Sequence, residues 1–166
     1  MTGTNLFNFK EREKMKECDN FKNVAEKFKS GSNCAQAVLS VYFPLLDLDD
    51  KIGHKMGAGL GAGIGRKQYV CGAVNAGAII LSLFYGDEEP GQKDKKKLAY
   101  EKVRNYIDLF EREFGTSQCR EIIGVDIATA YDRKKAEKMG LFKAKCVPCI
   151  KKVCEILDAE IIAGQE

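Results

Sequence analysis

The feature that most limits the fold of this chain is a glycine-rich run followed by a single cysteine and an apolar segment. The run, GAGLGAGIGR, covers residues 57–66, and Cys71 comes five residues after its end. Residues 72–85 are apolar except for Asn75 and Ser82, and the segment is too short to span a bilayer. The stretch therefore predicts a buried helix that begins beside a thiol.

The rest of the chain has the periodicity of helices. Apolar residues recur at every third or fourth position in residues 6–29 and 93–114, which is typical of amphipathic helices. Capping residues, proline and glycine delimit further helical segments, some of them short, which we expect at residues 34–43, 47–56, 70–85, 117–124, 132–139 and 146–162, with a loop at 140–145. Only the short stretch 127–131 has a strand-like composition. We predict one all-α domain over residues 1–166, with six or seven helices and a glycine-rich loop.

Composition argues against several classes of protein. The chain has 166 residues and a net charge of +3, and its lysines occur in short clusters that are typical of solvated surfaces. Neither a nucleic-acid interface nor a membrane span is expected. Residues 1–17 contain no continuous apolar stretch of the kind found in secretory signals, which favours a cytoplasmic protein.

Seven cysteines are many for a chain of this kind. Because disulfides are disfavoured in a reducing compartment, metal binding or redox chemistry is the better interpretation. Four of them fall at or beside the predicted start of a different helix, where free backbone N–H groups and the helix dipole favour a thiolate. These four are Cys34, Cys71, Cys119 and Cys146. Such a placement also arises by chance, and Cys18 is expected to be a buried apolar residue of its helix.

Four converging thiolates hold either a zinc ion or an iron–sulfur cluster. Zinc sites usually contain two closely spaced cysteine pairs, whereas the only CxxC pair here is Cys146 and Cys149. The scattered spacing favours a cluster slightly over zinc or another soft metal. Two alternatives stay open: a thiol–disulfide oxidoreductase that uses Cys146 and Cys149, and an interaction protein whose cysteines are buried and inert.

Several motifs resemble the redox-active protein family named C_GCAxxG_C_C. They are GIGR at residues 63–66, CGAVNAG at 71–77, FGTSQCREIIGVD at 114–126 and the last cysteine before EIL at 155–157, so the resemblance covers about residues 33–157. It implies that Cys34, Cys71, Cys119 and Cys146 are the four cysteines of the family. The family is similar to a domain of split-Soret cytochrome c whose cysteines are associated with a two-iron, two-sulfur (2Fe–2S) cluster, which favours a cluster over zinc.

This chain departs from the family pattern in a few places. Residue 76 is alanine, with the glycine of the motif displaced to Gly77, and Cys149 and Cys154 are extra cysteines. Whether either of them joins the site is left open, with Cys149 as a candidate spare ligand that exchanges with Cys146. No CxxCH motif for covalent haem is present. The glycine run also lacks the preceding strand that a dinucleotide-binding loop requires.

A few other residues are expected near the cofactor. Arg66 either balances the negative charge of the cofactor or binds carbonyl groups of the loop, and Gly72 follows Cys71 in the motif. His54, the only histidine, is either a ligand or proton donor or, as is more common, a surface or capping residue. The sequence predicts electron transfer or redox sensing, with a redox protein or a second copy of the chain as partner. Whether the chain is also an enzyme is left open.

Overall fold

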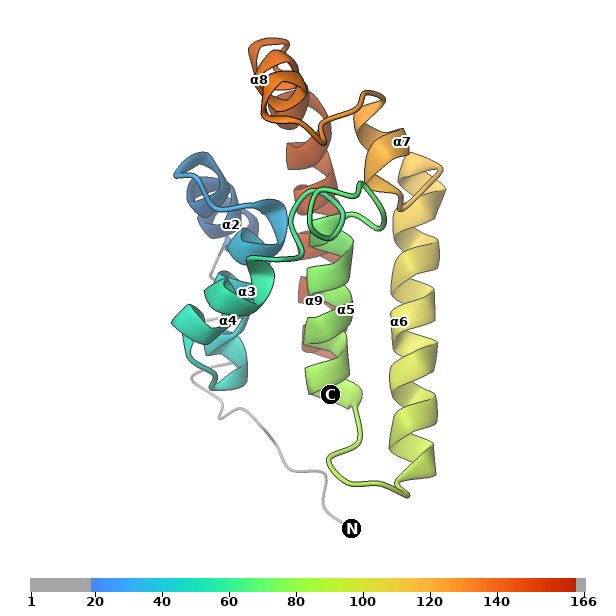
Figure 1. Cartoon of the computed structure of the whole chain (residues 1–166). Coiled ribbons are helices and arrows are strands. Elements are labelled where there is room, and N and C mark those ends of the chain that lie inside the picture. The colour runs from blue at the N-terminus through green and yellow to red at the C-terminus, as the bar shows by residue number, and fades with distance from the viewer. Residues whose placement is uncertain (1–18, 164–166) are drawn as a thin grey trace.

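The structure, a computed structural model, describes residues 19–163 and is built of helices (Figure 1). The α-helices are α2 (Asn20–Lys29), α3 (Cys34–Tyr42), α4 (Asp50–Gly57), α5 (Gly72–Tyr85), α6 (Lys93–Phe114), α7 (Cys119–Ile123), α8 (Ala130–Lys138) and α9 (Val147–Ala163). A 3₁₀ turn, η1 (Pro44–Leu46), follows α3, and a π-helical turn, η2 (Phe142–Cys146), directly precedes α9. The predicted all-α fold is confirmed, with eight α-helices in the described residues where six or seven were expected.

Helix α5 occupies the centre of the bundle. It packs against α3 on one side, α6 on the other and α9 behind it (Figure 1). One continuous core fills the space between these helices, with buried residues such as Leu39 of α3, Ile80 of α5, Phe110 of α6 and Leu157 of α9. No helix in residues 19–163 is long and apolar enough to cross a membrane, as the sequence predicts.

Local sequence explains where the main helices begin and end. At the start of α3, Asn33 Oδ1 accepts the Gln36 N–H at 2.9 Å and Gln36 Oε1 accepts the Asn33 N–H at 3.0 Å, which is a capping box. Helix α6 covers the predicted residues 93–114 and ends at Gly115, whose φ of 74° glycine adopts without strain. The first predicted helix, over residues 6–29, is not continuous: Asp19 is the N-cap of α2, which begins at Asn20. The rest of the predicted helix, with Cys18, lies outside the described residues.

The prediction of a loop at residues 140–145 is wrong. The backbone is already helical at Leu141, and η2 continues without a break into α9. Sequence reasoning placed a new helix start near Pro148 because proline is favoured in a first turn. Pro148 has no N–H to donate, and the wide π turn before it replaces regular α-helical bonding at this point. Residues 127–131 form no strand, and Thr129 instead caps α8 by accepting the Asp132 N–H at 3.1 Å.

The departure from the family motif at residues 76 and 77 has a packing reason. Tyr106 of α6 is buried against α5, and its hydroxyl donates to the carbonyl oxygens of Val74 at 3.2 Å and of Ala73 at 3.4 Å. A Cβ at position 77 would lie only 2.3 Å from that hydroxyl oxygen. Gly77 therefore makes room for Tyr106, while the methyl group of Ala76 is buried in the core.

Candidate functional site

Backbone pairing brings two of the predicted site cysteines together. The Cys71 N–H donates to the Ser117 carbonyl oxygen at 2.8 Å, and the Cys119 N–H donates to the Tyr69 carbonyl oxygen at 2.7 Å. Cys71 is the N-cap of α5 and Cys119 is the first residue of α7. The segments that precede these two helices thus lie side by side, and both helices begin with a cysteine at the same place.

The side chain of Gln68 binds the backbone of the segment between α7 and α8, next to the paired segments that precede α5 and α7. Gln68 is buried, its Oε1 accepts the Ile127 N–H at 3.0 Å, and its Nε2 donates to the Val125 carbonyl oxygen at 2.9 Å. These two bonds fix the connection between α7 and α8 against the end of the glycine-rich loop. The loop, α5 and α7 therefore form one frame around Cys71 and Cys119.

Cys34 lies against the start of α5. It is the first residue of α3, and its thiol shares a hydrogen bond with the thiol of Cys71. A Cβ on Gly72 would lie 2.6 Å from Cys34 Sγ, so a glycine at position 72 leaves the space that the sulfur occupies. Three backbone N–H groups also donate to this sulfur, those of Ala35, Ala62 and Ala73.

One of these N–H groups belongs to a strained part of the glycine-rich loop, the ring between α4 and α5 in Figure 1. Residues 62–66 all have positive φ, between 52° and 69°. Three of them, Ala62, Ile64 and Arg66, carry side chains, and a left-handed backbone costs each about 1 kcal/mol. Strain of this kind persists where the surrounding structure enforces it, which is common at functional sites. Here it accompanies the hydrogen bond from the Ala62 N–H to Cys34.

Cys146 and Cys149 reach the same centre from the last helix. Cys146 packs with Cys119 in a small second core beneath α8. Cys149 is fully buried and lies within electrostatic range of the other four thiols. We call Cys34, Cys71, Cys119, Cys146 and Cys149 the thiol centre. Sequence reasoning left open whether Cys149 joins the site, although its spacing of three residues from Cys146 on one helix would place both on the same face.

The sequence predicts that each of the four ligands lies at the start of a helix, and this is correct for three of them and wrong for Cys146. Cys34, Cys71 and Cys119 lie at the first turn of their helices. Cys146 is instead the last residue of η2, inside a continuous helix, so its backbone has no helix N-terminus to offer. A π-helical turn is a frequent feature of functional sites, and here it carries one of the thiols.

Hydrogen bonding lowers the pKa of one thiol of the centre, whereas hydrogen bonding or burial raises the pKa of the other four. The bonds from Cys71 and from backbone N–H groups lower the pKa of Cys34 from 9.0 to about 7, although burial acts in the other direction. The bond to Cys34, together with burial, raises the pKa of Cys71 well above 9.0. Burial raises the pKa of Cys119 and of Cys149 to about 12, and it also raises that of Cys146. Without metal, Cys34 is therefore the thiol of the centre that ionises first as the pH rises.

Cys154 lies apart from the thiol centre. It is buried on α9, where its carbonyl oxygen lies 3.2 Å from the Tyr42 hydroxyl. The same hydroxyl donates to Asp158 Oδ1 at 2.6 Å, and Asn20 Nδ2 donates to that oxygen at 2.9 Å. This polar cluster joins α2, α3 and α9, so the surroundings of Cys154 are structural.

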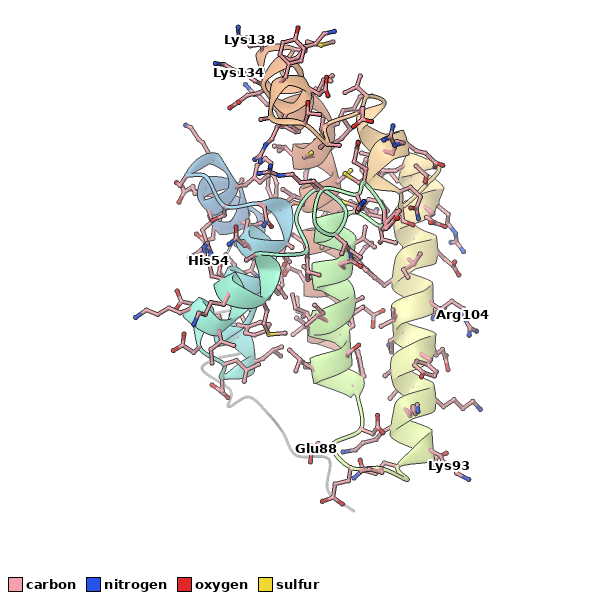
Figure 2. The ribbon with its side chains drawn as sticks, viewed as in Figure 1. His54, Glu88, Lys93, Arg104, Lys134 and Lys138 are labelled. Carbon is pink, nitrogen blue, oxygen red and sulfur yellow. The ribbon has the colours of Figure 1, made fainter. Side chains whose placement is uncertain are left out.

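Two further candidates are at the surface. His54 of α4 is exposed, and its Nε2 lies 3.1 Å from Gln36 Nε2, beside the capping box of α3 (Figure 2). Arg66 is exposed in the glycine-rich loop. Within residues 19–163, no three Cys, His, Asp or Glu side chains are arranged to hold a metal ion as they stand.

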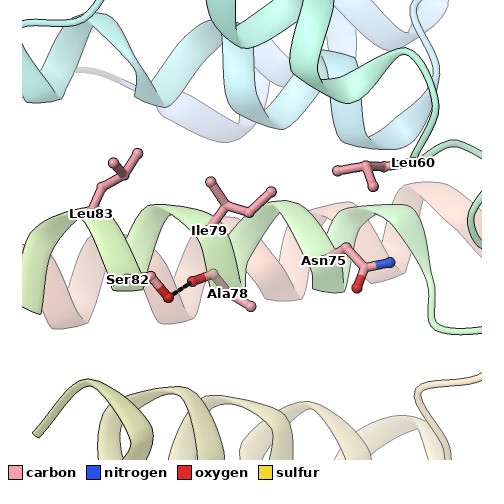
Figure 3. Close-up of a pocket in the computed structure, with 6 residues that line it drawn as sticks. All are labelled: Leu60, Asn75, Ala78, Ile79, Ser82 and Leu83. Atoms are coloured by element: carbon pink, nitrogen blue, oxygen red, sulfur yellow. Dashed lines mark hydrogen bonds between the residues drawn. The ribbon is translucent and has the colours of Figure 1, made fainter. Parts of the chain in front are cut away.

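A shallow apolar groove of about 400 Å³ runs along α5. Its lining includes Leu60, Ile79, Leu83 and Ser82, and Ser82 Oγ donates to the Ala78 carbonyl oxygen at 2.7 Å (Figure 3). Leu83 is 47% exposed, whereas most of the inner face of α5 is covered by its neighbours. The expectation that a second copy of the chain covers part of α5 stays a prediction.

Comparison with known proteins identifies the family. A family model described as "Putative redox-active protein (C_GCAxxG_C_C)" matches residues 32–160, a span that contains the whole thiol centre. No curated protein and no solved structure matches the chain. The similarity to split-Soret cytochrome c therefore stays a prediction. Because the family model matches well over half of the residues, this chain belongs to the C_GCAxxG_C_C family.

Proposed function

We propose that this chain is a redox protein in which Cys34, Cys71, Cys119 and Cys146 bind an iron–sulfur cluster, of the 2Fe–2S type, for electron transfer or redox sensing. The observation that carries the proposal is the convergence of these thiols from α3, α5, α7 and η2 at one place. Helices far apart in the sequence contribute one thiol each, which favours a cofactor held by a preformed scaffold over a short zinc-binding loop.

The chemistry of the donor set suits this cofactor. Four cysteine thiolates are the usual ligands of a 2Fe–2S cluster, which supplies one-electron chemistry when bound. Backbone N–H groups near a ligating sulfur tune the potential of such a cluster, and three of them already donate to Cys34. Since no three of the described side chains are positioned to hold an ion as they stand, ligation requires the thiols to reorient. Rotation about χ1 moves a cysteine sulfur by about 3 Å.

The test of this proposal is a metal analysis of the full chain purified without oxygen. We expect a brown protein with about two irons and two sulfides per chain. A colourless protein with one zinc per chain would replace the proposal with a non-redox metal-binding module, the alternative that the same donors allow. A protein without metal would leave only the thiol chemistry described next.

The hydrogen bond between Cys34 and Cys71 favours a second candidate function, thiol–disulfide exchange. The Cys34 thiolate would attack a small disulfide, and Cys71 would then resolve the mixed disulfide, so the small molecule leaves as two thiols and the chain keeps one disulfide. Sequence reasoning assigned such chemistry to Cys146 and Cys149. Burial raises the pKa of both of those thiols, so Cys34 and Cys71 are the better pair.

The acidity of Cys34 gives a testable pH dependence. In the metal-free protein, thiolate absorbance at 240 nm should rise by about one thiolate per chain with a midpoint near pH 7. Because the pKa of Cys34 is lowered on folding, its thiolate should stabilise the fold fully above pH 9, and this stabilisation should be lost as the pH falls through 7. The rise should be absent in Cys34→Ser and present in Cys154→Ser. A midpoint near 9 in the unmodified chain would contradict the assigned hydrogen bonds.

A further inference from the structure

The surface above the thiol centre is strongly basic. Residues 130–145, which form α8, the following turn and most of η2, hold six basic and two acidic side chains, a net charge of +4 in a chain whose total is +3. All six cations are exposed: Arg133, Lys134, Lys135, Lys138, Lys143 and Lys145. None of them takes part in an ion pair with another of the described residues. We call these six residues the basic cap.

The basic cap lies directly over the thiols. Ala136, on the buried side of α8, packs in the same small core as Cys119 and Cys146. Lys145 lies close enough to Cys149 for its charge to act on that thiol. A partner on this surface would thus approach the thiol centre through one layer of helix.

The opposite end of the molecule has four lysines but no excess charge. Figure 2 shows Lys134 and Lys138 at one end of the molecule and Lys93, at the start of α6, at the other. Residues 87–97 contain four basic and four acidic side chains, so their charges balance. The positive field is therefore concentrated at the end where α5 and α7 begin with their cysteines.

We propose that the basic cap is the docking surface for an acidic electron-carrier protein that exchanges electrons with the thiol centre. The inference rests on the proposed redox function. Complementary charge steers a carrier into a productive orientation and raises its association rate, mainly at low salt. Docking on the cap places the carrier over the buried thiols, with one electron leaving the carrier and one arriving at the centre in each encounter.

The test uses the full chain purified without oxygen and two probes, an acidic flavodoxin and a basic cytochrome c. Binding of each oxidised probe is measured by calorimetry at about 20 mM and at about 300 mM salt, because screening lengths differ widely between these conditions. We expect affinity for flavodoxin at low salt, at least a tenfold loss at high salt, and no affinity for cytochrome c. The rate at which reduced flavodoxin reduces the centre is measured separately.

Two double variants provide a matched comparison. Lys134→Glu with Lys138→Glu reverses two charges on the cap, and Lys93→Glu with Lys97→Glu reverses two charges at the same spacing on α6, with the same change in net charge. We expect at least a tenfold loss of flavodoxin affinity for the first and less than a twofold change for the second. Circular dichroism checks that both variants are folded.

The outcomes separate this inference from the function on which it rests. Equal losses in both double variants, or electron transfer that neither salt nor the cap variant slows, would overturn the docking surface and leave the redox function standing. Binding of RNA or of phosphatidylserine vesicles in place of flavodoxin would also overturn it. Cap-dependent binding without any electron transfer would support the surface and contradict the proposed redox function.

Discussion

Replacing Cys119 with serine should lower the iron content of the purified protein at least about tenfold. Mutation of residues that only support the ligands of a metal site commonly lowers metal affinity by about tenfold or more, and Cys119 is a proposed ligand itself. Its backbone is fixed beside Cys71 by the pairing of the segments before α5 and α7. Serine preserves the size of the side chain but offers a hydroxyl where a soft thiolate is needed. Iron and sulfide per chain are measured after purification without oxygen.

Cys154→Ser is the matched control for this variant. Both cysteines are buried, and burial raises the pKa of both to about 12. The pKa of Cys154 responds to a hydrogen bond with Tyr42 and to the charges of nearby carboxylates, and not to the thiol centre. Its iron content should therefore match that of the unmodified chain. Equal iron in both variants would refute the ligand assignment.

A third variant decides the place of Cys149. This thiol is buried among the four proposed ligands but is extra to the family pattern. If it is a spare thiol, Cys149→Ser should keep its iron while Cys146→Ser loses it. The reverse result would exchange these two residues in the ligand set and leave the other three assignments intact.

Gly57→Ala should destabilise the metal-free protein by about 2–3 kcal/mol, the cost of overpacking a tight contact. A Cβ at position 57 would lie 2.5 Å from the Gln36 backbone nitrogen and 2.9 Å from the Ala35 carbonyl carbon. Backbone atoms at the start of α3 cannot move aside as a flexible side chain does. The gain in helix propensity from glycine to alanine, about 1 kcal/mol, is too small to offset this overlap. Urea denaturation gives the free energy of unfolding.

Gly59→Ala, two residues further on, is the control. A Cβ at position 59 would meet no atom within 4 Å. Its free energy of unfolding should stay within about 0.5 kcal/mol of the unmodified chain. If Gly57→Ala were equally mild, α4 would not approach α3 as closely as described, and the position of Cys34 at that contact would be in doubt.

The sequence predicts the helices well where caps and periodicity agree. The capping box of Asn33 and Gln36 and the terminal Gly115 are local signals. In the structure, α3 begins at that capping box and α6 ends at Gly115. Local signals were misleading near Pro148, where a proline that is typical of a helix start lies inside a continuous helix. The π turn before it depends on packing and hydrogen bonding that a short sequence pattern does not predict.

The membership of the thiol centre could be predicted only in part. Helix starts indicated Cys34, Cys71 and Cys119, because the free N–H groups of a first turn are a local property. Cys149 joins the centre through the way α9 packs, which depends on contacts between distant segments. The hydrogen bond from Ala62 to Cys34 could not be predicted from the sequence either. It depends on a run of residues with positive φ, and only every second residue of that loop is a glycine.

The central claim, that the thiol centre holds a redox-active cluster, is tested most directly by electron paramagnetic resonance of the anaerobically purified chain during a redox titration. The account predicts no signal in the oxidised protein and, on reduction, about one unpaired spin for every two irons. The signal should disappear on reoxidation and be absent from Cys119→Ser. A protein that contains iron but gives no such reversible signal, or one that binds only zinc, would contradict the account.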